Sequence, residues 1–252
     1  MTIAASLPQS RTARRAAFGV AAVVALVMSL GAAHELRGPE AASRPWPDMA
    51  DRVVILPDGA ALHVQRHEVT VTEWNTCYSQ GGCPMALRPR AHHDPDTTPA
   101  TGLSHDDARA YVRWINAATG HEFRLPSLAE WTHMAQPVLP DAPDPLFTDP
   151  SLTWASSYLA EGLTPRALKP QGSFSVTPEG IADLDGSVWE WTQDCYADAA
   201  DGVDPARCPA YFVGGIHVAA MFYLERDPAR GGCAVGSPPA HLGLRLVSDG
   251  PV

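Results

Sequence analysis

The sequence contains few charged residues, only 18% of its 252 positions, and it contains a single lysine, Lys169. The 18 basic residues are outnumbered by 28 acidic ones, which gives a formal net charge of −10. A surface that binds nucleic acid needs clustered positive charge, so this balance argues against such a partner. Because 45% of the residues are hydrophobic, the chain has enough apolar side chains to build a real core.

Regular periodicity is also scarce, and the sequence contains no internal repeat. The 24 prolines and 20 glycines are typical of a globular chain rich in loops and exclude a coiled coil. The N-terminal half of the chain carries patterns typical of short helices, and the C-terminal half carries patterns typical of short strands with irregular loops. The sequence therefore predicts an α+β fold with much non-repetitive structure.

Residues 1–33 contain no acidic residue, and three arginines precede an apolar run of 18 residues at 16–33. This is the pattern of a secretory signal peptide, although the run is also nearly long enough for an uncleaved N-terminal membrane anchor. The stretch at 34–50 is rich in Pro, Ala and Arg and is predicted to be a linker. Both alternatives carry residues 34–252 across a membrane. We expect a protein that is periplasmic, or anchored in the inner membrane through residues 16–33 and facing the periplasm.

The five cysteines include no CxxC pair and are accompanied by no HxxxH pattern, which argues against a zinc site. In an oxidising compartment thiols tend to pair. The economical choice among the three possible pairings of four cysteines joins Cys77 to Cys83 and Cys195 to Cys208, because each pair encloses a short loop. Cys233 is then left over.

Three segments carry the start signal of a helix, a cap residue followed three positions later by an acid. These pairs are Thr70 with Glu73, Ser104 with Asp107, and Ser127 with Glu130. The sequence also predicts a hairpin from two β-type runs, Arg52 to Leu56 and Ala61 to His67, around a Pro-Asp-Gly turn. Two further β-type runs are Phe212 to Ala219 and Leu242 to Val247.

Several short strings then stand in a fixed order. They read Glu68-Val69-Thr70, RLPSLAEW at 124–131, DLDGSVWEWT at 183–192, Gly214-Gly215 and GLRLV at 243–247. Together they resemble the formylglycine-generating enzyme (sulfatase-modifying factor) family. The resemblance implies a domain at 51–250 with a variant of the C-type-lectin fold, which has little regular secondary structure.

The aromatic and charged residues in these strings have a structural interpretation of their own. Trp131, Trp189 and Trp191 can each bury a large apolar surface, and each indole N–H then needs a partner. Glu130 and Glu190 stand among aromatic residues, where a buried carboxylate must be paired or bound to a metal. Arg124 and Arg245 are their natural structural partners, and for Glu130 we favour this interpretation.

The resemblance also implies a structural calcium site at the loop 183–190. Its ligands would be side-chain oxygens of Asp183 and Glu190 and the backbone carbonyls of Gly186 and Val188. Calcium prefers such a mixture of oxygens from a tight loop. The alternative is an acidic turn exposed to water.

The chain departs from the family where catalysis would occur. The resemblance implies that catalytic members carry a pair of cysteines shortly after a Gly-Gly-Ser string. This pair holds copper(I), a metal that soft thiolates suit. Here Ile216 follows Gly215, and no cysteine occurs from Pro209 to Gly232. We therefore expect neither copper nor the family's oxidation of a substrate cysteine.

The remaining hypothesis is an exported, non-catalytic domain that binds a protein or ligand through the groove that is catalytic in relatives. Trp189, His217, Met221 and Tyr223 are its predicted residues. The resemblance also implies a mildly apolar patch at Ala219 to Tyr223 and Pro238 to His241, which suits a protein partner in the periplasm. An accessory factor of a periplasmic enzyme and an immunity protein both fit. The alternative is a divergent oxidoreductase or protein-modifying enzyme that uses other residues, with His217, Glu225 and Cys233 as candidates.

Overall fold

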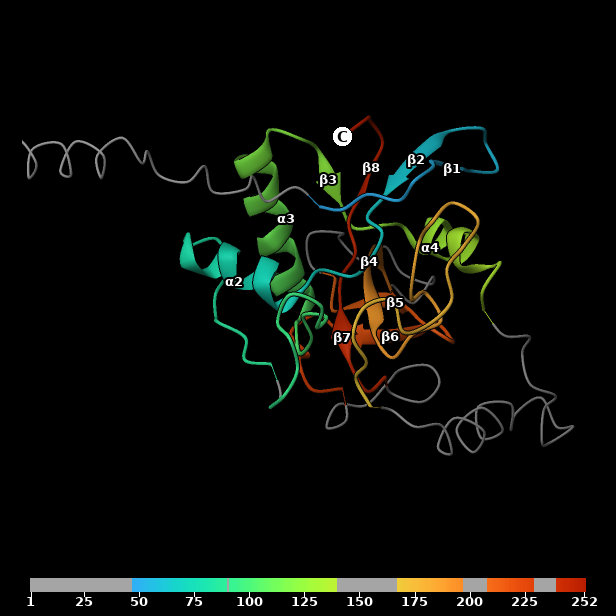
Figure 1. Ribbon diagram of the computed structural model, residues 1–252. Helices are drawn as coiled ribbons and strands as arrows, with labels where there is room; N and C mark the ends of the chain where they lie inside the picture. The colour runs from blue at the N-terminus through green and yellow to red at the C-terminus, as the bar shows by residue number, and fades with distance from the viewer. Residues whose placement is uncertain (1–46, 90, 140–166, 197–207, 229–238) are drawn as a thin grey trace, which may run out of the picture. The chain divides into compact units, whose positions relative to one another are not determined.

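The computed structural model describes residues 47–89, 91–139, 167–196, 208–228 and 239–252, all within the unit Pro45–Val252 (Figure 1). The predicted signal peptide or anchor, most of the predicted linker and Cys233 lie outside the described residues. Within the described ranges, no helix is long and apolar enough to cross a membrane.

The first sheet has the strand order β1-β2-β8-β3, with every neighbouring pair antiparallel. Its strands are β1 (Val54–Ile55), β2 (Ala61–Val64), β3 (Phe123–Arg124) and β8 (Val247–Ser248). The predicted hairpin is confirmed as β1 and β2, joined by a turn in which Gly59 has a φ of 87°. Residues 48–50 also pair with this hairpin, through Ala50 N–H to the Val64 carbonyl at 2.8 Å and a bridge from Met49 to Gln65. The packed domain thus begins slightly before residue 51.

The second sheet has the strand order β6-β5-β4-β7. Its strands are β4 (Trp189–Cys195), β5 (Ala210–Gly214), β6 (Ala219–Phe222) and β7 (Leu242–Gly243), and only the β4–β7 pair is parallel.

Two of the predicted strands are each divided between two shorter strands in the structure. The run Phe212 to Ala219 is the end of β5, a turn and the start of β6, because the chain reverses after Gly214-Gly215. The run Leu242 to Val247 is divided between β7 and β8, which belong to different sheets. Leu244 to Leu246 lie between these two strands and belong to neither, and the side chain of Arg245 in this segment is buried.

All three predicted helices are confirmed. They are α2 (Val71–Ser79), α3 (His105–Thr119) and α4 (Leu128–Ala135), and each begins with the expected capping box. Gly120 ends α3 in the left-handed conformation, with a φ of 76°. Figure 1 shows α2 beside α3 on one side of the sheets, and α4 against β4 and β5.

The core consists of two clusters that meet at the sheets. The larger one lies between α2, α3 and the second sheet, and the smaller one gathers residues of β2, α4 and β8. The three tryptophans of the family strings are buried and have partners as expected. Trp131 donates to Glu190 at 2.8 Å, Trp189 to the His217 carbonyl at 3.1 Å, and Trp191 to the Leu103 carbonyl at 2.7 Å.

Candidate functional site

The end of β5 lies against two indole rings. A Cβ added at Gly214 would stand 2.2 Å from the ring of Trp131, and one added at Gly215 would stand 2.5 Å from the ring of Trp189. No side chain can be accommodated at such distances without displacement of the rings. The Gly-Gly string is therefore required for packing, whatever chemistry follows it.

The segment after this string holds the predicted groove residues, and the structure brings only some of them together. The rings of Trp189 and His217 meet edge to face at 5.3 Å. Met221 is fully buried in β6, so its side chain packs in the core and cannot line a groove. Tyr223 is half-buried, and its carbonyl accepts from the backbone N–H of His105 at 3.0 Å.

The exposed apolar side chains on this edge are Phe222 and Leu224, with exposures of 51% and 49%. The apolar patch predicted at Ala219 to Tyr223 includes Phe222, and Leu224 lies just beyond it. Alternation in a strand that buries Met221 places Phe222 on the opposite face. The carboxylate of Asp107 holds this segment in place through Arg226, with contacts of 2.6 and 2.7 Å. We call Phe222, Tyr223 and Leu224 the β6 edge.

The same segment contains no pair of thiolates for copper. In residues 208–228 the only cysteine is Cys208, which is disulfide-bonded. Ala219 and Ala220 are buried. These residues do not fit a copper(I) site, which needs two soft thiolate ligands.

The loop predicted to bind calcium already satisfies its carboxylates with protein donors. Asp183 accepts from the backbone N–H groups of Gly172 at 2.5 Å and Phe174 at 2.8 Å. Glu190 accepts from Trp131 and from Arg245. Across the described ranges, no group of three or more His, Cys, Asp or Glu side chains is arranged to hold a metal ion. Both carboxylates thus have protein donors, and calcium binding at this loop stays a prediction.

Arg245 is the centre of a buried charge cluster. Its guanidinium lies 2.8 Å from Glu190 Oε1 and 3.9 Å from Glu68 Oε2, and all three side chains are buried. It also donates to the carbonyls of Gln65, Arg66 and Ala182.

The two carboxylates of this cluster are unequal. Glu68 Oε2 has no hydrogen-bond partner. Burial raises the pKa of Glu68 to about 8, against the attraction of Arg245. Burial thus favours the neutral form of Glu68, and the close ion pair of the cluster is the one between Arg245 and Glu190.

The second expected pair is also confirmed. Arg124 binds both carboxylate oxygens of Glu130 at 2.7 Å and also contacts Asp249. The guanidinium of Arg124 lowers the pKa of Glu130 despite the partial burial of that carboxyl. This pair ties β3 to the start of α4 and to the C-terminal segment.

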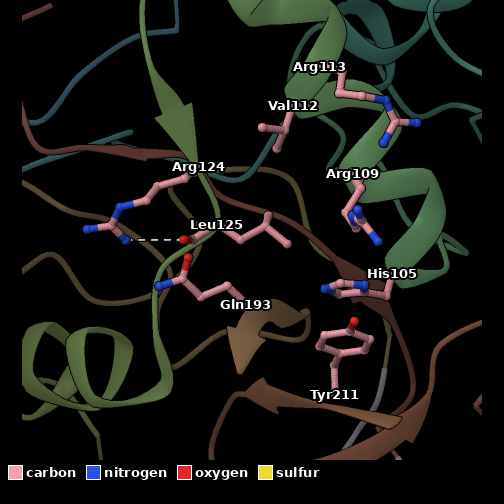
Figure 2. A pocket seen from close by; sticks show the side chains of 8 residues that line it. All are labelled: His105, Arg109, Val112, Arg113, Arg124, Leu125, Gln193 and Tyr211. Atoms are coloured by element: carbon pink, nitrogen blue, oxygen red, sulfur yellow. Dashed lines mark hydrogen bonds between the residues drawn. The ribbon is translucent and has the colours of Figure 1, made fainter. Parts of the chain in front are cut away.

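The structure also reveals a pocket that the sequence analysis did not predict. It has a volume of about 470 Å³ and lies between α3, β3 and the second sheet (Figure 2). It is lined by His105, Arg109, Val112, Arg113, Arg124, Leu125, Gln193 and Tyr211. The sequence could have indicated part of this pocket, because His105, Arg109 and Arg113 are spaced four positions apart and so share one face of a helix.

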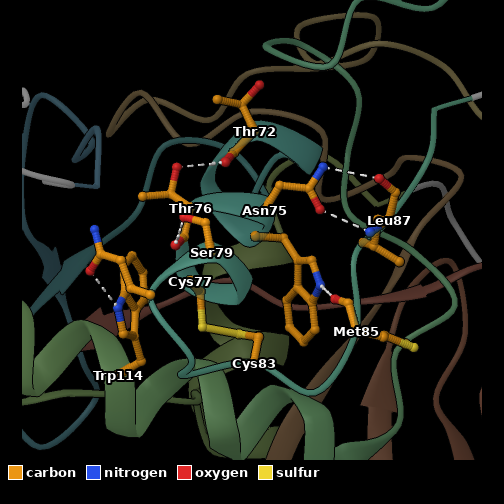
Figure 3. Close-up of a disulfide and its surroundings, with 11 residues drawn as sticks. Thr72, Asn75, Thr76, Cys77, Ser79, Cys83, Met85, Leu87 and Trp114 are labelled. Atoms are coloured by element: carbon orange, nitrogen blue, oxygen red, sulfur yellow. Dashed lines mark hydrogen bonds between the residues drawn. A yellow bond between two sulfur atoms is a disulfide. The ribbon is translucent and has the colours of Figure 1, made fainter.

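Both proposed disulfides are present. Cys77 pairs with Cys83 across six positions, and Cys195 pairs with Cys208 across thirteen. Figure 3 shows the first bond between α2 and the loop that follows it, close to Trp114. A Cβ added at Gly82 would stand 2.6 Å from the Trp114 side chain, so this loop is packed tightly against α3.

The fold, the tryptophan partners and the Gly-Gly packing define a domain of the formylglycine-generating-enzyme type. The family model of the sulfatase-modifying factor enzyme 1-like domain matches residues 50–250, and the chain belongs to this family. The formylglycine-generating enzyme of Mycobacterium tuberculosis (strain ATCC 25618 / H37Rv) is 28% identical over 178 residues. The match covers 60% of this chain and 57% of that enzyme, so it spans little more than half of the relative.

Two solved structures are similar to this chain. PvdO from Pseudomonas aeruginosa has a TM-score of 0.52 at 20% identity, with 75% of this chain and 80% of that chain covered, which shows a shared fold. CarF has a TM-score of 0.47 at 17% identity, with coverage of 76% and 87%.

Proposed function

We propose that this chain is an exported, non-catalytic member of its family that binds a protein partner through the β6 edge. The observation that carries the proposal is the composition of the segment from Pro209 to Gly232, which contains no cysteine. Without two thiolates the segment cannot hold copper(I) in the way that the family's oxidation requires.

The β6 edge supports a protein partner. Phe222 and Leu224 are two large apolar side chains, about half exposed and two positions apart. Phe222 also stacks edge to face on Tyr223, with ring centres 4.8 Å apart. Exposed aromatic and aliphatic side chains gathered in this way are typical of anchors in protein interfaces.

Export is supported by residues 1–33, whose basic start and apolar run suit a signal peptide or an anchor. An alkaline phosphatase fusion after residue 50 tests it, because that reporter folds only in an oxidising compartment. We expect an active reporter, and an inactive one would contradict export. The mass of the mature chain then distinguishes a cleaved peptide from a retained anchor.

The absence of catalysis is tested with a CxPxR-type peptide, copper(I) and oxygen, followed by mass spectrometry. We expect an unchanged peptide. Formation of the aldehyde would overturn the proposal and favour the alternative, an enzyme that uses residues other than a cysteine pair.

Partner binding is tested with a photo-crosslinking residue at position 222 in the full chain, in cells. The matched control carries it at Ile55, which is 58% exposed on the other sheet. We expect one crosslinked protein from position 222 and none from position 55. With that partner purified, Phe222→Asp should weaken binding at least tenfold and Ile55→Asp should not. Equal crosslinking from both positions would overturn the assignment of the β6 edge.

A further inference from the structure

We propose that the pocket between α3, β3 and the second sheet binds a small organic oxyanion, a carboxylate or phosphate on an apolar body. Its charged group would meet Arg109 and Arg113, and its body would lie over His105 and Tyr211. This site is separate from the β6 edge and does not depend on the proposed function.

The positive charge of the pocket is the first argument. Arg109 and Arg113 project from the same face of α3 (Figure 2), and neither has an ion pair or a hydrogen bond with any residue that the structure describes. Like charges four positions apart on a helix repel. No Asp or Glu is among the described lining residues. In a chain with a net charge of −10, two adjacent arginines without a carboxylate are well placed for an external anion.

Arg124 lies on the opposite wall of the pocket and, unlike Arg109 and Arg113, is paired with carboxylates. Its guanidinium is bound by Glu130 and Asp249, so its charge is already compensated. The chain thus neutralises the arginine that supports its fold and leaves the other two open. An anion in the pocket would be held by Arg109 and Arg113.

The floor of the pocket is the second argument. His105 is only 3% exposed, and neither of its ring nitrogens makes a hydrogen bond of normal geometry. Its ring stacks on Tyr211 with centroids 3.5 Å apart and planes 10° apart. A buried polar group without a partner costs about 1–3 kcal/mol. A ligand that accepts a hydrogen bond from the imidazole N–H, after a small turn of the ring toward the pocket, would offset this cost.

The protonation state of His105 determines which hydrogen bonds its ring can make with a ligand. Burial, followed by the charge of Arg109, lowers its pKa to about 4, although the nearby Thr192 carbonyl opposes the shift. The imidazole is therefore neutral at physiological pH and presents one N–H donor and one acceptor nitrogen. It contributes a directed hydrogen bond, while the charge comes from the arginines.

The walls set the ligand class. Val112 and Leu125 provide apolar surface, and Gln193 provides an amide. The volume of about 470 Å³ falls in the range of small-molecule sites, roughly 300–1,000 Å³. A bare inorganic anion would leave Tyr211 and the apolar walls uncovered. An aromatic or aliphatic acid would place its charged group at the arginines and its apolar body against these walls.

The test is a calorimetric titration of the purified full chain with phenyl phosphate, benzoate, inorganic phosphate and, as a cationic control, benzylamine. We expect saturable one-to-one binding of phenyl phosphate or benzoate, weaker binding of inorganic phosphate, and no binding of benzylamine. The stronger of the two organic anions distinguishes a phosphate from a carboxylate ligand. Absence of saturable binding of both at millimolar concentration would overturn the proposal.

Three variants locate the site. Arg109→Gln and Arg113→Gln should each weaken binding about tenfold to a hundredfold, the range of a lost charge-assisted hydrogen bond. Arg88→Gln removes the same charge from an exposed position outside the pocket and should leave affinity unchanged. If Arg88→Gln weakens binding equally, the anions respond only to overall charge and the site is refuted.

His105→Phe keeps an aromatic ring on Tyr211 and removes the N–H. It should weaken binding while leaving the melting temperature close to that of the wild type or above it, because an unpaired polar group is lost. In parallel, the imidazole resonances of His105 should shift with added ligand in the wild type but not in Arg109→Gln. Resonances that stay unmoved at saturation would place the ligand elsewhere.

Discussion

Arg245 and Glu190 share three hydrogen bonds of 2.8 to 3.1 Å at a point where neither side chain is exposed to solvent. Glu190 belongs to β4 of the second sheet, and Arg245 stands between β7 and β8, one strand from each sheet. The pair therefore joins the two sheets. A buried ion pair of this kind is costly to break because the remaining charge has no compensation.

Arg245→Met should destabilise the fold by about 3–5 kcal/mol, since it leaves Glu190 buried and unpaired. The double variant Arg245→Met with Glu190→Met should lose less than the sum of the two single variants. Urea unfolding of all three forms measures the coupling. Additive losses would show that the two residues act independently.

Glu68→Gln should change the pH dependence of stability. The folded pKa of Glu68, about 8, lies above its unfolded value, so its contribution is fully present below the unfolded pKa and is lost as the pH rises through 8. The Gln variant keeps the neutral state at every pH. Its free energy of unfolding, measured by urea between pH 5 and 9, should fall less than that of the wild type. Glu122→Gln, at an exposed position, is the control, and parallel profiles for wild type and Glu68→Gln would contradict the assignment.

Gly214→Ala should destabilise the domain by about 1–3 kcal/mol or more, because the added methyl group overlaps the ring of Trp131. Gly250→Ala introduces the same atom where nothing lies within 4 Å and serves as the matched control. Thermal unfolding compares the two. Equal effects would mean that the close approach to Trp131 is unimportant.

The two disulfides should differ in stabilisation and in access. Chain-entropy arguments give about 2 kcal/mol for the Cys77–Cys83 loop and about 3 kcal/mol for the longer Cys195–Cys208 loop. Cys77 is fully buried and Cys195 is half-buried, so a reductant should open Cys195–Cys208 first. Alkylation followed by mass spectrometry reports the order, and the reverse order would contradict the burial argument.

Calcium should leave the melting temperature unchanged, since Asp183 and Glu190 already accept hydrogen bonds from the protein. Melting curves with chelator and with added calcium measure this. A calcium-dependent rise that disappears in Asp183→Asn would restore the calcium site implied by the family resemblance.

Local signals in the sequence predicted the features that depend on near neighbours. The capping boxes at Thr70, Ser104 and Ser127 each begin a helix at the expected position. Such signals work because the bonds join residues three positions apart. The cost of burying a polar group predicted that the indole N–H of Trp131 has a partner and that Arg124 pairs with Glu130. It did not identify Glu190 as the partner of Trp131.

Features that depend on the packing of distant segments were not predictable in the same way. Met221 was expected in a groove, yet β6 directs it into the core. The run from Leu242 to Val247 looked like one strand because its apolar residues are continuous, while the insertion of Arg245 divides it. The pocket under α3 depends on Tyr211 from a strand about a hundred positions later, so only its helical half was visible in the sequence.

The Gly214-Gly215 string has a consequence for how such sequences are interpreted. Its role is steric, since each glycine makes room for an indole ring, and that role does not depend on which residues follow it. A string of this kind therefore reports the packing of the scaffold. A match to these strings identifies the fold, and the residues that follow the glycines must be inspected before an activity is assigned.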